Sequence, residues 1–308
     1  MTTKRDTQEA ERVHPPLLPA RWLATSRWRY RFGSLMRSRS GLLGATIVAV
    51  MLVVAAAPGQ LAPQDPNKQV LIRYLQPPTP FVSWFGTDNL GRDILSRTIY
   101  GARVSLAIGL SATVLAATCG VTLGLVAGYS GGVLDDLLMR VADVQLAFPY
   151  LLLAIAIIGV LGASMLNLIL VLAIANWVVY ARLVRAEVLS LRSLEFVTAA
   201  RCVGAGMPRL LLRHFFPNVV PSIIVIATFG IANAIIAEAG LSFLGMGVPP
   251  EIPSWGGMLA DGRARIDTAW WQALFPGLAI VVGVLGINLL GDHLREELDP
   301  RGRSRTVF

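Results

Sequence analysis

The residues whose spacing most suggests a chemical role lie in a polar segment, Glu195 to Asn218, between two long apolar runs. It reads EFVTAARCVGAGMPRLLLRHFFPN and places Ala199 and Ala200 side by side. Successive alanines on a helix present almost no side chain, so the groove of a partner protein can close directly on the backbone. This pattern indicates recognition of another protein; the alternative is an ordinary solvated connector between two apolar segments.

The same segment is predicted to fold as two short helices joined by a turn. Ser193 is expected to cap a first helix from Glu195 to Val203, which ends at the glycine-rich turn 204–206. Pro208 is expected to open a second helix and Pro217 to stop it.

Motifs for hydrolysis are missing from the sequence. It has no G-x-x-x-x-G-K-[ST] phosphate loop, no H-E-x-x-H pair and no nucleophile elbow. The cysteines, Cys119 and Cys202, and the histidines, His14, His214 and His293, share no ligand spacing. The sequence therefore predicts no cofactor, no metal site and no ATP hydrolysis by this chain. An intramembrane enzyme would need a buried nucleophile or metal set, which the sequence does not provide.

Composition places the chain in a membrane. Hydrophobic residues make up 54% of the 308 residues, and the mean hydropathy is +0.60, values that a soluble domain does not sustain. A span needs about 20 apolar residues. A tight hairpin is expected at Gly159 to Asn167, because the run from Leu137 to Tyr180 is too long for one crossing. The expected fold is all-α, a polytopic membrane protein with about six transmembrane helices. The predicted spans are Leu42 to Ala57, Val104 to Gly128, Val141 to Leu161, Leu166 to Tyr180, Val219 to Ala237 and Trp271 to Leu290.

Basic residues indicate the orientation of these spans. Most of the 27 lysines and arginines fall in the N-terminal tail, the segment after the fourth span and the C-terminal tail. Under a six-span count all three lie on one side, so both termini are expected to be cytoplasmic. The net charge of +8 then needs only anionic lipid headgroups of the bilayer as its partner, and no nucleic acid.

The polar segment resembles the EAA loop of ABC importer permeases, which docks a cytoplasmic ATPase. Thr198 stands where that family has glutamate, and His214 and Phe216 stand where it has aliphatic residues. The alanines, the glycine, the proline and their spacing carry the resemblance. The residues that it implies for coupling to the ATPase are Glu195, Phe196, Thr198, Ala199, Ala200, Arg201, Gly204, Ala205, Gly206, His214 and Pro217.

A second segment, Phe85 to Leu106, carries a more specific resemblance. Its sequence, FGTDNLGRDILSRTIYGARVSL, is similar to the segment that leads into the second span in the dipeptide, oligopeptide and nickel branch of these permeases. Asp88 and Asp93 are expected to precede an amphipathic helix, with Arg92 and Arg97 covering the outer rim of the spans. This helix either plugs the mouth between the spans or receives a protein that delivers the substrate.

Polar residues in or near the spans are candidates for an outer gate or pathway. Glu238, in a stretch that again resembles this branch, is expected near the outer end of the fifth span, with structural pairing favoured over substrate contact. A polar path could be lined by Asn176, Trp177, Asn233 and Asn288, but each could equally bond a neighbouring helix. The candidates for gate or pathway are Glu238, Asn176, Asp88 and Arg92. Small residues are expected to pack helices closely at Ala112, Ala116, Gly120, Gly124 and Gly128.

The resemblance implies a permease subunit of an ATP-driven importer of peptides, a nickel chelate or a related solute such as glutathione, in a bacterial or archaeal inner membrane. It also implies a second homologous permease, cytoplasmic ATP-binding subunits and an extracytoplasmic solute-binding protein. An ion-coupled secondary transporter is the alternative, although the spans hold few ionisable residues and no repeat is evident. The expected organisation is a cytoplasmic tail (1–40), a first span with an external loop (41–100), the permease transmembrane domain (101–295) and a second cytoplasmic tail (296–308).

Overall fold

The computed structural model describes residues 38–298, so the expected tails at 1–40 and 296–308 lie almost wholly outside the described part of the chain. Residues 38–298 form helices and no strand, with only two isolated bridges in the loop before α4. This confirms the all-α prediction. The helices are α2 (Arg39–Ala56), α3 (Pro58–Leu61), η1 (Leu71–Arg73), α4 (Ile94–Ser130), α5 (Gly132–Leu146), α6 (Tyr150–Leu161), α7 (Met165–Arg192), α8 (Glu195–Cys202), α9 (Met207–Leu210), the π-helical turn η2 (Leu211–Phe215), α10 (Phe216–Phe243), α11 (Trp255–Arg263) and α12 (Trp271–Leu298).

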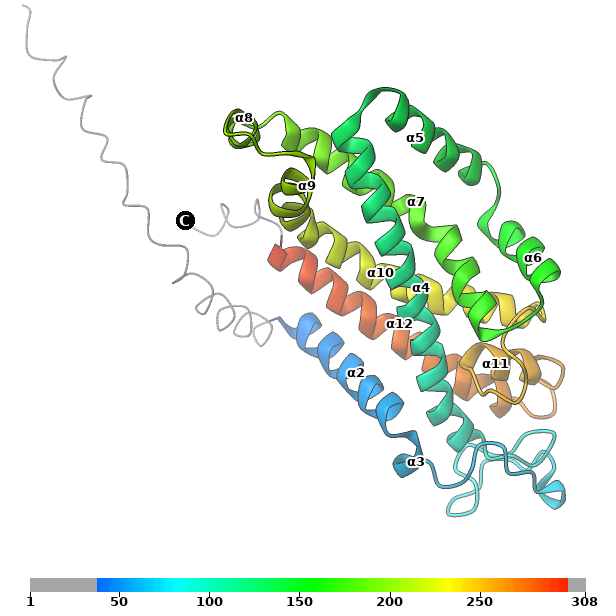
Figure 1. Cartoon of the computed structure of the whole chain (residues 1–308). Helices are drawn as coiled ribbons and strands as arrows, with labels where there is room; N and C mark the ends of the chain where they lie inside the picture. The colour runs from blue at the N-terminus through cyan, green and yellow to red at the C-terminus, as the bar shows by residue number, and fades with distance from the viewer. Residues whose placement is uncertain (1–37, 299–308) are drawn as a thin grey trace, which may run out of the picture.

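Five helices are long and apolar enough to cross a membrane, namely α2, α4, α7, the run from α9 through α10, and α12. A sixth crossing arises if α5 and α6, bent by 87° at a short break, count as one span. The expected number of spans is thus confirmed. In Figure 1, α8 and α9 lie at one end of the bundle, and α3 with the loop before α4 lies at the other.

The third predicted span, Val141 to Leu161, is wrong as a single helix. Pro149 precedes α6 and cannot continue α5, because proline has no N–H and a fixed φ. The polar half, α5, instead pairs with α7. Arg185 donates to Asp135 at 2.7 Å, and Arg182 pairs with Asp143. Asp135 and Asp143 therefore hold α5 beside α7.

The predicted hairpin between α6 and α7 is confirmed. Gly162 has a φ of +85°, which favours glycine, and Ser164 caps α7 by accepting from the Asn167 N–H at 3.1 Å. The Asn167 side chain also donates to the Leu161 and Gly162 carbonyls at the end of α6. The turn is thus closed by its own side chains.

Small residues let α4 and α7 approach closely. The predicted series from Ala112 to Gly128 is buried. A Cβ on Gly124 would lie 2.6 Å from the Ala181 carbonyl oxygen, and one on Gly128 would lie 2.8 Å from Val188 Cβ. This confirms close helix packing at these positions.

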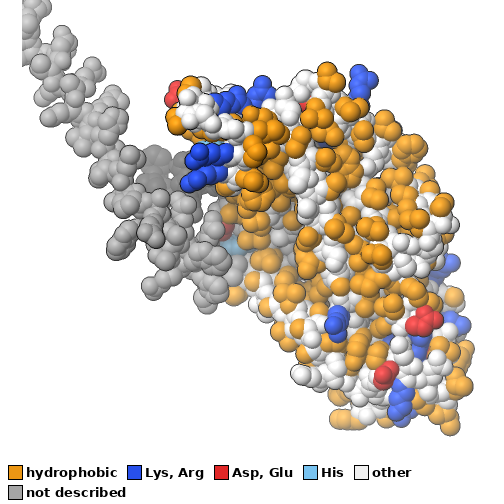
Figure 2. Space-filling model, in the orientation of Figure 1, with side chains coloured by type: hydrophobic (Ala, Val, Ile, Leu, Met, Phe, Trp, Pro, Cys, Tyr) orange, Lys and Arg blue, Asp and Glu red, His pale blue; other side chains and the backbone are white. Residues whose placement is uncertain are grey.

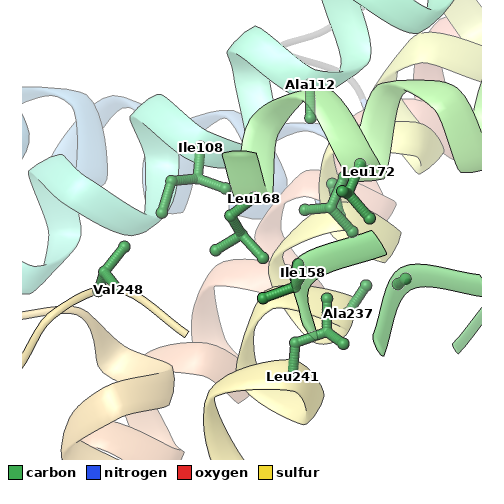
Figure 3. Packing of buried hydrophobic residues seen from close by; sticks show 11 residues of the cluster. Ile108, Ala112, Ile158, Leu168, Leu172, Ala237, Leu241 and Val248 are labelled. Carbon is green, nitrogen blue, oxygen red and sulfur yellow. The ribbon is translucent and has the colours of Figure 1, made fainter. Parts of the chain in front are cut away.

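One apolar cluster joins four helices. Figure 3 shows Ile108 and Ala112 of α4, Ile158 of α6, Leu168 and Leu172 of α7, and Ala237 and Leu241 of α10, with Val248 from the following loop. On the face seen in Figure 2, hydrophobic side chains cover the middle of the molecule, while charged side chains lie mostly toward its ends. An apolar middle with charged ends is the distribution that a bilayer requires.

Candidate functional site

The polar segment forms a small helical platform at one end of the bundle. Helix α8 begins at Glu195 and ends at Cys202, within one residue of the prediction. The expected cap is wrong, because the Ser193 hydroxyl donates to the Ser190 carbonyl and the N-cap position is Leu194. The serine that the sequence pattern assigned to α8 as a cap is thus hydrogen-bonded to the end of α7 instead.

The turn after α8 depends on one glycine. Gly204 has a φ of +86°, while Gly206 has an ordinary φ of −74°. The Ala205 N–H donates to the Ala200 carbonyl at 3.0 Å, and the Gly204 N–H donates to the Arg201 carbonyl at 2.9 Å. This pair of bonds is a Schellman motif, in which the left-handed residue is usually glycine.

Pro217 does not stop the second helix, contrary to the prediction. Pro208 does open α9, but the helix then continues through η2 into α10, and Pro217 lies in the first turn of α10. In the π-helical turn the Phe216 N–H donates to the Leu211 carbonyl, five residues back, which widens the helix just before the proline. The platform is therefore joined to a membrane span without a break.

Helix α8 has two apolar faces. Val197 is fully buried, and Ala200 and Ala205 pack beside it against a cluster of α7 and α10 residues. On the opposite side Ala199 is exposed between Phe196, 43% exposed, and Val203, 90% exposed. The two predicted alanines therefore differ, since Ala200 packs within the platform and only Ala199 faces outward.

The other platform residues lie around these faces. Glu195, Thr198 and Arg201 are exposed, and the Arg201 guanidinium lies 5.6 Å from the centre of the Tyr129 ring. The His214 ring lies 6.3 Å from the Phe196 ring. Cys202 is exposed on the platform, and Cys119 is exposed in α4.

The loop before α4 is held by buried ion pairs. Asp88 and Arg92 are each 6% exposed, and Arg92 Nε donates to Asp88 Oδ2 at 2.6 Å. Arg97, 2% exposed, lies 3.9 Å from the same carboxylate. Neither arginine is exposed on a rim as predicted, because Arg92 pairs with Asp88 and Arg97 also donates to the Pro66 and Pro250 carbonyls. Asp93 caps α4 through the Ser96 N–H, so the loop leads directly into that helix.

Glu238 connects α10 to α11. It is fully buried near the end of α10, and its Oε1 accepts from the Ser242 and Ser254 hydroxyls, each at 2.9 Å. Ser254 is also the N-cap of α11, accepting from the Gly257 N–H. This geometry is structural pairing, the role that the sequence favoured. Glu238 therefore fixes helix α11 against the end of α10.

A second feature of this end is a cavity of about 770 Å³ between the loop after α10 and α11. Asp261 and Arg263 of α11 line it, together with Arg97. Partial burial raises the pKa of Asp261, and the charges of Arg97 and Arg92 oppose this shift. The cavity carries both signs of charge on the side of the bundle opposite the platform.

Asn176 lines a smaller cavity, of about 250 Å³, between α4, α7 and α10. Thr113 of α4, Tyr180 of α7 and Asn233 of α10 line the same cavity. Both asparagines were recognised as candidates from the sequence, whereas Tyr180 and Thr113 were missed. Tyr180 could have been found by spacing, because it lies one helical turn after Asn176 and so shares its face of the helix.

These features define a class, a multi-pass α-helical membrane protein with a helical platform outside the lipid. The chain belongs to the family of binding-protein-dependent transport system inner membrane components, which matches residues 120–304. Residues 26–78 match the N-terminal transmembrane domain of oligopeptide transport permease C. The two resemblances drawn from sequence motifs are thereby confirmed at the level of the family.

Curated relatives align with nearly the whole chain. The dipeptide transport system permease protein DppC of Alkalihalophilus pseudofirmus is 42% identical, covering 92% of this chain and 93% of the relative. The di/tripeptide permease DppC of Pseudomonas aeruginosa is 44% identical over 85% and 88%. The glutathione permease GsiD of Pectobacterium atrosepticum is 39% identical over 90% and 92%.

A solved structure has the same fold. The inward-facing MetNI methionine ABC transporter matches with a TM-score of 0.54 and 17% identity, covering 67% of this chain and 96% of that chain. With the family match, the chain is a multi-pass inner-membrane permease subunit of an ABC importer, a transport component and not an enzyme. Such a permease works with an ATPase and a binding protein.

Proposed function

We propose that this chain forms half of the translocation pathway of a peptide importer, with a second homologous permease forming the other half. The named relatives are permeases for dipeptides, di- and tripeptides, and glutathione, which is itself a small peptide. Peptide is the substrate class that these relatives share, and it is preferred to a nickel chelate on that basis. Choice among peptides belongs to the separate solute-binding protein.

The observation that carries the mechanism is the outward face of α8. Phe196, Ala199 and Val203 follow at spacings of three and four residues, so they share one side of the helix. Large apolar side chains exposed on a platform outside lipid mark a surface for another protein. The small Ala199 at the centre leaves room for a groove of the cytoplasmic ATPase, in which Glu195, Thr198 and Arg201 would border the contact. His214 and Pro217 contribute through the second helix, Pro217 as part of the connection to α10.

The orientation follows from docking and from charge. An ATPase at α8 requires that the platform and both termini be cytoplasmic, which agrees with the excess of arginine in the tails and the platform. The loop before α4 and the helix α11 then lie outside, where the solute-binding protein arrives. The division into tails at 1–40 and 296–308, an external loop within 41–100 and a permease domain at 101–295 accords with this topology.

A reconstituted complex of both permeases, ATPase and binding protein tests the proposal. We expect peptide uptake into proteoliposomes that requires ATP and is absent with an ion gradient alone. Uptake driven by a proton or sodium gradient without ATP would identify a secondary transporter and reject the proposal.

Ala199→Glu tests the docking face. A charge buried in the contact costs several kcal/mol, so the ATPase should no longer co-purify with the permeases. Thr198→Glu is the matched control, because it places the same charge on an adjacent face of α8, at the position where the family has glutamate. Equal ATPase recovery with both variants would contradict the assignment of this face.

A further inference from the structure

The cavity between α4, α7 and α10 has an unusual lining for the interior of a membrane protein. Four polar side chains, Thr113, Asn176, Tyr180 and Asn233, meet there from three different helices, and no charged residue contributes. All four lie near the middle of their helices. Intramembrane polar groups of this kind usually face a cavity or a partner.

Most of the hydrogen-bonding capacity of this lining is unused. The Tyr180 hydroxyl belongs to a residue only 2% exposed, yet it has no partner among residues 38–298. Asn176 uses only its NH₂ group, which donates to the Leu172 carbonyl at 2.8 Å. No hydrogen bond of the Asn233 or Thr113 side chain occurs in the described part of the chain. Asn176 is partly buried and Asn233 is exposed, so an incoming solute can reach both. The Tyr180 hydroxyl is buried, and buried polar groups are almost always paired. Its missing partner therefore indicates a polar ligand in this cavity.

The backbone of α10 keeps this space open. Gly230 faces the Tyr180 hydroxyl so closely that a Cβ at this position would overlap it. Glycine thus allows the hydroxyl to stand against α10 beside Asn233, about one helical turn further along. The apolar part of the lining includes Phe229 and Leu172.

We propose that this cavity is a subsite for the peptide unit of the transported solute. A peptide unit carries one N–H donor and one C=O acceptor, and an asparagine side chain offers both groups in return. Crossing an apolar interior leaves such a unit unpaired unless the protein supplies partners. Neutral partners bind weakly enough for the solute to leave again, as conduction requires. Because no charged residue lines the cavity, the subsite binds the backbone of the peptide and does not select for the charge of its side chains. This inference rests on the proposed peptide transport.

The test compares a dipeptide with its ester isostere in the reconstituted complex. The ester replaces the amide N–H by oxygen and is a weaker acceptor, so it gains less from the subsite. Each solute is supplied on saturating binding protein, which keeps differences in capture out of the rate. The variants are Tyr180→Phe, Asn176→Ala and Asn233→Ala, and the controls are Tyr100→Phe and Asn288→Ala, which delete the same groups away from the cavity.

We expect each cavity variant to lower dipeptide uptake about threefold to tenfold and ester uptake much less, while the controls leave both rates unchanged. Tyr180→Phe removes only an unpaired hydroxyl, so its thermal stability should equal or exceed that of the wild type. Equal losses for dipeptide and ester, or no loss with Tyr180→Phe, would overturn the subsite alone. Failure of the wild-type complex to import any loaded peptide would overturn the proposed function as well.

Discussion

At the scale of single residues, the two glycines of the platform turn have different roles. Gly204 has positive φ and Gly206 does not, and a Cβ added at either position would meet no atom within 4 Å. Substitution therefore tests backbone conformation alone. We expect Gly204→Ala to destabilise the turn by about 1 kcal/mol and to reduce ATPase co-purification, whereas Gly206→Ala should behave as wild type. Equal recovery of ATPase with both variants would show that the left-handed residue does not set the position of α8.

The serines that bind Glu238 allow a second comparison. Ser242 and Ser254 each donate to the same carboxylate oxygen, but only Ser254 also caps a helix. Ser254→Ala should lower the unfolding free energy by about 1 kcal/mol more than Ser242→Ala, because it removes the N-cap of α11 as well. Thermal unfolding of the purified complex measures the difference. If Ser242→Ala were the more damaging change, the cap would contribute nothing measurable.

Local patterns predicted some of these residues and missed others. The alanines, Gly204 and Asp93 follow rules that a few neighbouring residues determine, so they could be recognised from spacing. Ser193 does not cap α8 because its hydroxyl donates to a carbonyl at the end of α7. Spacing alone does not show which of two helices such a side chain will bond. The inward position of Arg92 depends on the folded loop around Asp88 and was equally hidden.

At the scale of helices, the contact between α4 and α7 rests on glycine. A Cβ at Gly124 would collide with the backbone of α7, whereas a Cβ at Gly240 in α10 would meet nothing within 4 Å. We expect Gly124→Ala to destabilise the protein by about 1–3 kcal/mol through overpacking. Gly240→Ala should be neutral or stabilising by up to about 1 kcal/mol, as expected for helix propensity alone. Thermal unfolding in detergent compares the stability of the two variants. Similar midpoints would mean that α4 and α7 can move apart without loss of stability.

Helix types and approximate positions were predictable because apolar length and turn residues mark them along the chain. The break between α5 and α6 could not be predicted in this way. Its proline stood inside an apolar run, and the ion pairs that turn α5 toward α7 join residues about 40 to 50 positions apart. The continuation of α9 into α10 was also missed, because proline usually indicates the end of a helix. Here a π-helical turn precedes the proline and the helix continues through it.

At the scale of the whole molecule, topology can be tested with cysteines on opposite ends of the bundle. Cys202 is exposed on the platform, and Lys68 is exposed in the loop before α4. In a Cys119→Ala background, an impermeant thiol reagent should label Cys202 only after the cells are opened. With Cys202 also replaced by alanine, Lys68→Cys should be labelled in intact cells. The reverse pattern would invert the proposed orientation.

The unbroken helix from Met207 to Phe243 has a mechanical consequence. Its 37 residues correspond to a rod about 55 Å long. A tilt of about 5° around the platform end would move the far end sideways by about 5 Å, close to the pitch of one helical turn. The hydrogen bond between Glu238 and Ser254 joins α11 to that far end, so α11 would move together with it. The helix is therefore long enough to act as a lever arm, which would carry a small tilt at the platform to the opposite membrane surface without unfolding any helix.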